Sequence, residues 1–210
     1  MDSSDGIDQR RESGQRTRTR LLEAALDLLA ERTEDGVTLR ELTDAAGANV
    51  SAVSYHFGSL KALCDAAIEQ ALERYLAAQE SAVGALGRES TVEELATAFA
   101  RPMIRALAAG GRDLDVMRIV ARGGLDPPAA WDRFDPRFDR IRAEVVRVLK
   151  SNLPNVKRDE LIFRSRAAAG LLNWLALAPL GGTLRDKSEK RVEQWLVPVV
   201  AGAFRGTGAA

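Results

Sequence analysis

The sequence contains one cysteine and one histidine among its 210 residues. Because Cys64 stands alone, the chain can form neither an internal disulfide nor a zinc site that needs several cysteines. His56 has no second histidine with which to complete a metal site or a catalytic pair. The sequence also lacks a G-x-S-x-G motif, a Walker loop and a C-x-x-C pair. We therefore expect no catalytic residue, no metal and no cofactor, and a buried Cys64 on an apolar helical stripe.

An excess of charge of one sign is also missing, because thirty basic residues balance thirty acidic ones. A net charge of zero excludes a protein that coats polyanions by bulk charge, so any contact with nucleic acid must be local. The polar N-terminus has no apolar segment typical of a secretory signal. The longest uncharged stretch, residues 167–184, is interrupted by Asn173, Pro179 and a glycine pair, so we expect no membrane span. The cysteine usage indicates a cytoplasmic protein.

Helical periodicity dominates the chain, which predicts an all-α fold. Two S/T-x-x-E capping boxes, at Thr38 and Thr91, mark helix starts, and Asn49 is a good N-cap. Pro198 should kink the last helix or end it early. We expect helices over residues 17–32, 38–47, 50–57, about 60–83, 92–109, 113–122, from 135 onward with Asp135 as N-cap, 161–178 and 186–204.

Two short helices that are joined by a glycine-containing turn of about three residues form a helix-turn-helix arrangement. The run VTLRELTDAAGANVSAVSYHFGSLKAL, residues 37–63, resembles the DNA-binding domain of the TetR family of transcriptional repressors. The YHFGS ending is similar to the branch of fatty-acid-responsive repressors. The resemblance implies a three-helix helix-turn-helix domain, followed by a larger helical domain that binds a ligand and dimerises.

The second short helix is the expected recognition helix. Val53 and Phe57 lie one turn apart and should pack on the first helix, which leaves the small side chains free to approach base edges. The basic residues near the N-terminus can reach the minor groove or form only a solvated tail. Residues 1–75 carry nine basic and fourteen acidic residues, so this half is acidic overall. The candidate DNA-binding residues are Thr38, Val50, Ser51, Ala52, Ser54, Tyr55, His56, Lys61, Arg16 and Arg18.

The remaining chain offers a ligand site and a dimer interface. The methionine and aromatic residues of this region have two interpretations: they line a ligand cavity, or they belong to the core. The nearby arginines likewise either pair with an anionic ligand or are solvated. The candidate ligand-binding residues are Met103, Leu107, Met117, Phe134, Phe138, Trp174, Arg105, Arg118 and Arg122. The last two helices have more apolar surface than one stripe needs, which predicts a dimer interface. The candidate dimerisation residues are Leu172, Leu175, Val192, Trp195, Leu196 and Val199.

The expected organisation has four parts. Residues 1–16 form a flexible arm that contains arginine, 17–58 bind DNA, 59–205 connect, bind ligand and dimerise, and 206–210 form a tail. The partners would be a double-stranded DNA operator, a small apolar or acyl effector and a second copy of the chain. The alternative is an α-helical small-molecule-binding protein or enzyme domain, whose short helix pair is only structural. A duplex-binding assay separates the two interpretations.

Overall fold

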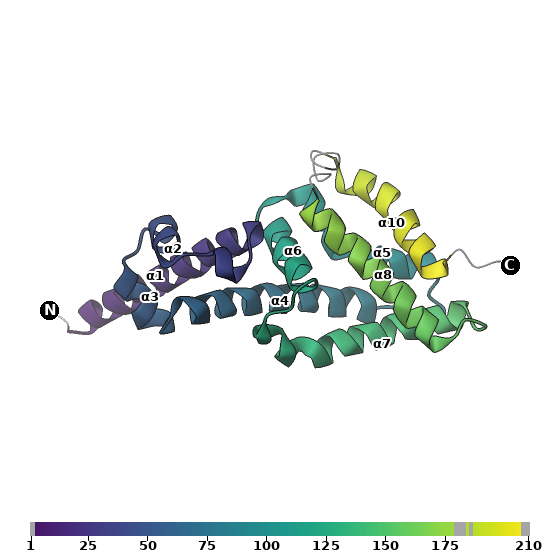
Figure 1. Ribbon diagram of the computed structural model, residues 1–210, viewed down its shortest axis with the longest axis horizontal. Coiled ribbons are helices and arrows are strands. Elements are labelled where there is room, and N and C mark those ends of the chain that lie inside the picture. Colours follow the sequence, from purple (N-terminus) through teal and green to yellow (C-terminus); the bar gives the residue numbers. More distant parts are fainter. Residues whose placement is uncertain (1–2, 179–183, 185–186, 207–210) are drawn as a thin grey trace. The chain divides into compact units, whose positions relative to one another are not determined.

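A computed structural model describes residues 3–178, 184 and 187–206, with side chains from Arg11 onward. Every regular element in these ranges is a helix, which confirms the all-α fold class (Figure 1). The helices are α1 (Ser3–Glu31), η1 (Glu34–Gly36), α2 (Leu39–Ala46), α3 (Val50–Phe57), α4 (Leu60–Gly84), α5 (Val92–Ala109), α6 (Gly111–Gly123), η2 (Ala129–Phe134), α7 (Asp135–Asn152), α8 (Arg158–Leu177) and α10 (Glu189–Arg205).

The chain divides into two compact units, residues 1–71 and 72–210. In the first unit, α1 packs against α2 and α3. Its core is made of leucine and valine side chains from α1, α2, α3 and the start of α4, namely Leu21, Leu26, Leu42, Val53 and Leu63. Cys64 is buried as expected, and burial raises the pKa of its thiol to about 11.

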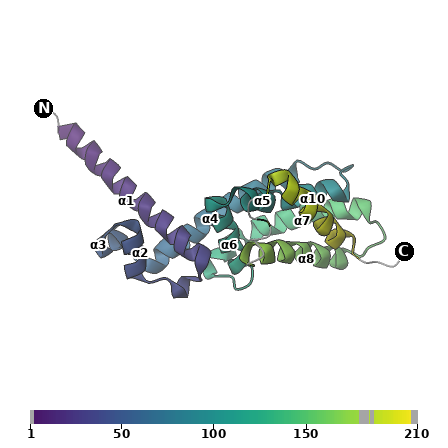
Figure 2. The ribbon, with the colours of Figure 1, turned by 90° about the horizontal axis from the view of Figure 1, so that it is seen from above.

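Two expected boundaries of the first unit differ from the structure. Residues 3–16, expected to be a flexible arm, are helical, because α1 begins at Ser3 and continues without a break to Glu31 (Figure 2). The first unit extends to Ala71 rather than residue 58, because apolar residues at the start of α4 complete its core. Of the expected C-terminal tail, only Gly206 lies within the described residues.

The second unit packs α10 against α5 and α8, while α8 also contacts α6 and α7. The second capping box is present at the start of α5. The Thr91 side chain accepts a hydrogen bond from the Glu94 backbone N–H, and the Glu94 side chain accepts one from the Thr91 backbone N–H. Pro198 lies inside α10, which continues to Arg205, so it does not end the helix early. Asp135 is the first residue of α7 rather than its N-cap.

Aromatic side chains fill the centre of the second unit. The rings of Phe99 and Phe204 meet edge to face with centroids 5.5 Å apart, which joins α5 to α10. Trp131 of η2 stacks on Phe138 of α7 at 5.3 Å. Its indole also lies so close to Gly123 that a Cβ atom at this position would be 2.3 Å from Trp131 Cζ2. The close approach of η2 to α6 therefore depends on glycine.

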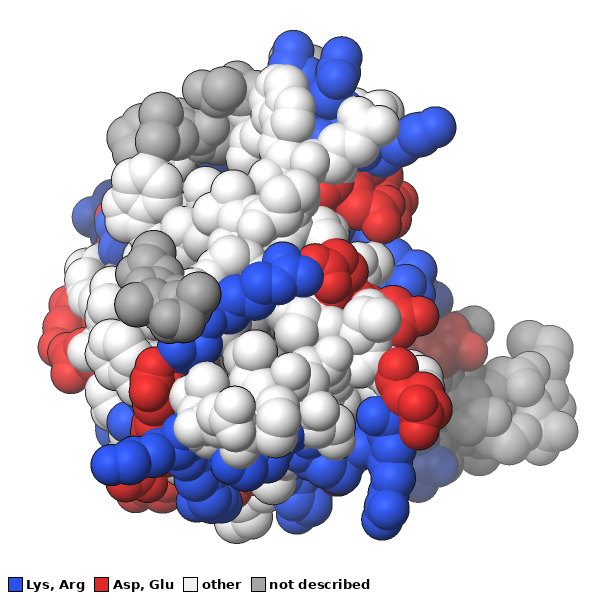
Figure 3. Space-filling model, turned by 90° about the vertical axis from the view of Figure 1, so that its right-hand side faces the viewer, with Lys and Arg blue, Asp and Glu red and all other residues white. Residues whose placement is uncertain are grey.

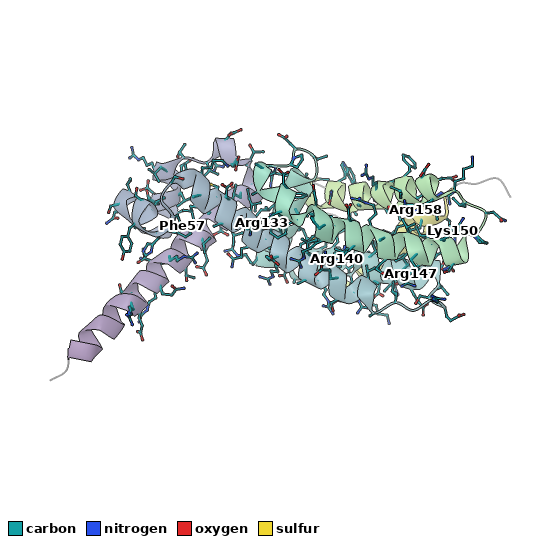
Figure 4. The ribbon with its side chains drawn as sticks, turned by 90° about the horizontal axis from the view of Figure 1, so that it is seen from below. Phe57, Arg133, Arg140, Arg147, Lys150 and Arg158 are labelled. Atoms are coloured by element: carbon teal, nitrogen blue, oxygen red, sulfur yellow. The ribbon has the colours of Figure 1, made fainter. Side chains whose placement is uncertain are left out.

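Basic side chains gather on the α7 side of the second unit, along the lower edge of the face in Figure 3. Arg140 and Arg147 follow one another along α7, and Lys150 lies near its end (Figure 4). Several of these charges are already used within the fold. Arg147 pairs with Glu144 at 2.7 Å, and Lys150 Nζ donates to the carbonyl oxygens of Pro154 and Val156. Lys150 therefore supports the turn between α7 and α8, and Arg147 is neutralised within α7.

Substituting Gly123 tests the packing of Trp131. We expect Gly123→Ala to lower the free energy of unfolding by about 1–3 kcal/mol, because the added methyl group overpacks against the indole. Gly84→Ala is the matched control, since Gly84 also ends a helix but no described atom lies within 4 Å of its added Cβ. Urea unfolding followed by circular dichroism gives both values, and equal midpoints for the two variants would contradict the packing argument.

Arg137 offers a test of electrostatic stabilisation. Its guanidinium binds Glu80 through two hydrogen bonds, of 2.9 and 2.7 Å, and these lower the pKa of Glu80. This pairing stabilises the fold fully above the pKa of Glu80 in the unfolded chain, about 4.3. The stabilisation is lost as the pH falls through the pKa of Glu80 in the folded protein, which is lower. We expect Arg137→Met to cost about 1 kcal/mol at neutral pH, because the pair is partly solvated. The cost should shrink in urea unfolding at pH 3, whereas Arg101→Met, at an exposed position on α5, should cost little at either pH.

Candidate nucleic-acid interface and ligand cavity

The start of α2 is held by a capping box. Thr38 Oγ1 accepts a hydrogen bond from the Glu41 backbone N–H at 3.3 Å, and a Glu41 carboxylate oxygen accepts one from the Thr38 N–H at 3.2 Å. The Thr38 hydroxyl also donates to that carboxylate at 2.7 Å, and this bond is the main cause of a lowered pKa for Glu41. If the Thr38 hydroxyl, a candidate DNA-binding group, donated to a phosphate, it would lose this hydrogen bond to Glu41.

The turn between α2 and α3 is set by Gly47 and Asn49. Gly47 has φ 57° and ψ 42°, in the left-handed region that glycine adopts with little strain. Asn49 Oδ1 then accepts hydrogen bonds from the Ala52 N–H at 2.8 Å and from Ser51 Oγ at 2.7 Å. The two helices are thus separated by three residues, as the sequence predicts.

One side of α3 is buried and the other is open. Val53 is 1% exposed and belongs to the core, while Tyr55 is 84% exposed. Ala52, His56 and Phe57 are half-buried. The exposed side also carries Val50, Ser51 and Ser54. The outward face expected for the recognition helix is therefore available, although its contact with DNA stays a prediction.

Helix α1 passes beside α3. A Cβ atom at Gly14 would lie 3.8 Å from Cε1 of His56, and the guanidinium of Arg18 lies 5.0 Å from the centroid of the Phe57 ring. Arg20 Nη1 donates to the Gly47 carbonyl oxygen at 3.3 Å. The arginine-rich part of α1 is thereby joined to the turn and to the recognition helix, and Arg20 is a contact that the sequence did not predict.

Two of the expected basic contacts carry internal partners. Lys61 pairs with Asp65 at 3.0 Å and with Glu34 at 3.7 Å, and the hydrogen bond to Asp65 is the main cause of its raised pKa. Arg16 pairs with Glu12 at 3.0 Å, with both side chains exposed. A phosphate would have to displace these carboxylates, which weakens Lys61 and Arg16 as contacts.

The second unit contains a cavity of about 170 Å³, called here the central cavity. Five α-helices and η2 contribute to it, and its walls include Tyr75, Phe99, Val120, Trp131, Phe138, Ile141, Arg142, Val145, Arg166, Ala169 and Asn173. A smaller space of about 10 Å³ adjoins it, because both are lined by Tyr75, Phe99, Val120, Ala169 and Asn173.

The expected ligand-binding residues fall into three groups. Phe138 lines the central cavity, and Met103 and Met117 line the smaller space beside it. The others lie elsewhere. Leu107 and Phe134 are buried outside the described linings, and Trp174 is 52% exposed on α8. Arg105 borders a separate open groove and pairs with Glu189 at 3.8 Å, Arg118 pairs with Asp115 at 3.5 Å, and Arg122 borders none of these spaces.

Buried polar groups border these spaces, and none of them is among the expected ligand-binding residues. Gln79 is 2% exposed and its Nε2 donates to the Phe99 carbonyl oxygen at 3.0 Å, but its Oε1 has no partner among the described residues. The buried Trp131 Nε1 likewise lacks an acceptor there. The sequence pattern could have identified Gln79 as a buried polar residue, because it lies on the apolar stripe of α4, between Leu76 and Val83. No comparable pattern in the sequence distinguishes the other polar residues of the cavity walls, Arg142, Arg166 and Asn173.

The expected dimerisation residues divide by burial. Leu172, Val192 and Leu196 are buried within the unit, so they pack in the core of one protomer and expose little surface to a partner. Leu175 is half-buried. Trp195 and Val199 are exposed by 44% and 53%, and the rings of Phe163 and Trp174 on α8 are exposed as well. The exposed apolar surface therefore includes Trp195 and Val199, which the sequence suggested, and Phe163 and Trp174, which it did not assign to an interface.

In the part of the chain that the structure describes, no helix is long and apolar enough to cross a membrane. No group of three or more His, Cys, Asp and Glu side chains there could hold a metal ion.

Two family models match the chain. The model of bacterial regulatory proteins, tetR family, matches residues 21–67, and the model of the tetracyclin repressor-like C-terminal domain matches residues 97–203. The first match contains the helix-turn-helix, and the second contains most of the cavity walls. No curated protein matches the chain.

Several solved structures share the fold. PfmR, a TetR family regulator from Thermus thermophilus, is 19% identical with a TM-score of 0.64, over 90% of this chain and 100% of its own. KstR2, a ketosteroid transcriptional regulator of Mycobacterium tuberculosis, is 20% identical with a TM-score of 0.61, over 88% and 93%. AibR, in complex with isovaleryl coenzyme A and operator DNA, is 15% identical with a TM-score of 0.66, over 87% and 97%. At these identities the likeness concerns the fold.

Proposed function

Because the chain belongs to the TetR family of bacterial regulatory proteins, we propose that it represses transcription as a homodimer that binds a palindromic operator and releases it on binding a small effector. The observation that carries this proposal is the open face of α3, where Val50, Ser51, Ser54 and Tyr55 are exposed directly after a glycine turn. Such a regulator acts in the cytoplasm, where bacterial DNA lies.

The chemistry of α3 suits base and phosphate contacts. Serine hydroxyls hydrogen-bond base edges in the major groove, and small side chains let the helix backbone approach closely. The Tyr55 hydroxyl lies at an exposed position where it can donate to a phosphate oxygen and so fix the register of the helix. Val53 holds the helix against the core without contacting DNA.

The exposed apolar residues of α8 and α10 support dimerisation. Phe163 and Trp174 on α8 and Trp195 and Val199 on α10 are large side chains left open to solvent, and the two helices pack on each other. Where such side chains form one patch they mark a protein interaction site, so a partner is expected to cover them. A second copy presents the same face, as a two-fold dimer requires.

Helix α4 supports the coupling of effector to operator. Its residues up to Ala71 belong to the first unit and the rest belong to the second, where Tyr75 borders the central cavity. An effector that binds one position of this helix better than another changes operator affinity by that difference in free energy and by no more. AibR, whose fold is similar, was solved with both an acyl coenzyme A and operator DNA, which is consistent with such a coupling.

Selection of bound duplexes from random DNA should yield an inverted repeat, because a two-fold dimer presents two recognition helices to two half-sites. On the selected duplex, we expect Tyr55→Ala to weaken binding by about 1–3 kcal/mol, measured by fluorescence anisotropy. Leu125→Ala is the control, because Leu125 is also largely exposed but lies in the second unit. Unchanged affinity in folded Tyr55→Ala and Ser54→Ala variants, or selection of no preferred duplex, would count against specific DNA binding.

The dimer face can be tested with exposed residues only. We expect Trp195→Glu combined with Val199→Glu to give folded monomers in sedimentation equilibrium, because both side chains are exposed in one protomer and the carboxylates would be buried in the dimer. Leu196→Glu would be a poor test, since Leu196 is buried and its substitution would unfold the unit. A folded dimer of the double variant would place the interface elsewhere, and Leu125→Glu is the control for an added charge.

A further inference from the structure

A second space opens beside the central cavity, between α7 and α8. This groove measures about 340 Å³ and is lined by Asp139, Arg142, Ala143, Val146, Arg158, Ile162 and Arg166. Arg142 and Arg166 line both the groove and the central cavity. The groove therefore leads from the surface to the interior of the second unit, and the shared arginines lie where the two spaces meet.

The charge of the groove is positive. Asp139 pairs with Arg142, so these two residues largely offset each other. Arg158, which begins α8 (Figure 4), and Arg166, two turns later, are exposed and have no ion pair among the residues that the structure describes. Arg166 lies where the groove meets the cavity and Arg158 lies further along the groove, and both can bind an anion there, because charge-assisted hydrogen bonds to carboxylate or phosphate oxygens are strong.

The interior of the central cavity is apolar and small. Its walls are aromatic on one side, where Phe138 lies between Trp131 at 5.3 Å and Tyr75 at 6.3 Å, measured between ring centroids. An apolar cavity of about 150 Å³ holds one benzene ring, so about 170 Å³ admits one aromatic ring or a short branched chain. A long acyl chain would not fit within the central cavity alone.

The buried polar atoms indicate that the site is built for a guest with some polarity. The Trp131 side chain borders the central cavity, and its Nε1 atom, which lies on the side of Gly123, has no acceptor among the described residues. An unpaired buried donor is costly, and a carbonyl oxygen of the ligand would satisfy it. The unpaired Gln79 Oε1 borders the small space of about 10 Å³, which is close to the size that one water molecule needs.

We infer that the effector is an organic anion with a small apolar acyl body, which enters between α7 and α8, seats that body in the central cavity and leaves its charged end at Arg158 and Arg166. The inference rests on the proposed function, because it names the chemistry of the effector proposed there. It also corrects the expected arginines, since Arg105, Arg118 and Arg122 do not border this site.

The test is calorimetric titration of the full-length protein with four probes. Phenylacetate and phenylacetyl coenzyme A carry the same ring with a carboxylate or with phosphates, phenylacetamide is the neutral equivalent, and palmitoyl coenzyme A has a long chain. The proteins are the wild type, Arg158→Ala, Arg166→Ala and Arg140→Ala. Arg140 is the matched control, because it is an exposed arginine of α7 that lies toward Glu80 of α4, at 3.9 Å, rather than along the groove.

We expect at least one phenylacetyl anion to bind at least tenfold more tightly than the amide. We also expect Arg158→Ala and Arg166→Ala to weaken it about tenfold each, with Arg140→Ala unchanged. Preference for the acid places a carboxylate at the arginines, and preference for the thioester places phosphates there. The inference is wrong if neither anion binds better than the amide, if both arginine variants bind like the wild type, or if palmitoyl coenzyme A binds more tightly than phenylacetyl coenzyme A.

The titration requires no DNA, so this inference is separated from the proposed function by comparing it with the duplex selection and with duplex release, measured by anisotropy in the presence of each anion. A protein that selects a palindrome but binds none of the anions leaves the regulator intact and overturns the effector chemistry. A protein that binds a phenylacetyl anion through Arg158 and Arg166 without releasing the duplex supports the site and overturns only effector-driven release.

Discussion

The apolar stripe of α4 is the feature on which both units depend. Leu63 and Ala67 complete the core of the first unit, while Leu72, Leu76 and Val83 are buried in the second. A single continuous helix therefore supplies packing to both, and its position cannot change without changing contacts in each core. Gln79 interrupts the stripe at a cost, which the hydrogen bond to the Phe99 carbonyl oxygen partly offsets.

The candidate DNA surface works with little free positive charge. Lys61 is paired with two carboxylates, and Arg18 and Arg20 are engaged with Phe57 and the Gly47 carbonyl. These arginines remain cationic while they fix α1 to the recognition helix, so the same side chains can support the fold and still attract phosphate. With so few unpaired cations, affinity would depend on the fit of α3 in the groove, and the loss of affinity with salt should be modest.

Local signals predicted the helix-turn-helix better than the cavity. The Thr38 and Asn49 caps and the Gly47 turn act over three or four residues, so the sequence displays them directly. The central cavity gathers residues from six helices, and which face of each helix it receives depends on packing that no local pattern records. Trp174 illustrates the difference, because its stripe suggested a cavity wall but α8 presents it to solvent. Leu196 shows the opposite case. It was expected at a surface interface, but it is buried in the core although the neighbouring Trp195 is exposed.

Helix α8 provides both a wall of the central cavity and part of the exposed apolar surface. Asn173 and Ala169 line the central cavity, while Trp174 and Phe163 lie on the exposed apolar side of the same helix. Asn173 and Trp174 thus face the cavity and the exposed apolar surface, about 100° apart around a helix of 3.6 residues per turn. If a guest in the cavity displaces α8, the exposed apolar side of the helix moves with it, because a packed helix moves as a body. In a dimer built on α8 and α10, the spacing of the two recognition helices would then depend on cavity occupancy through α8 as well as through α4.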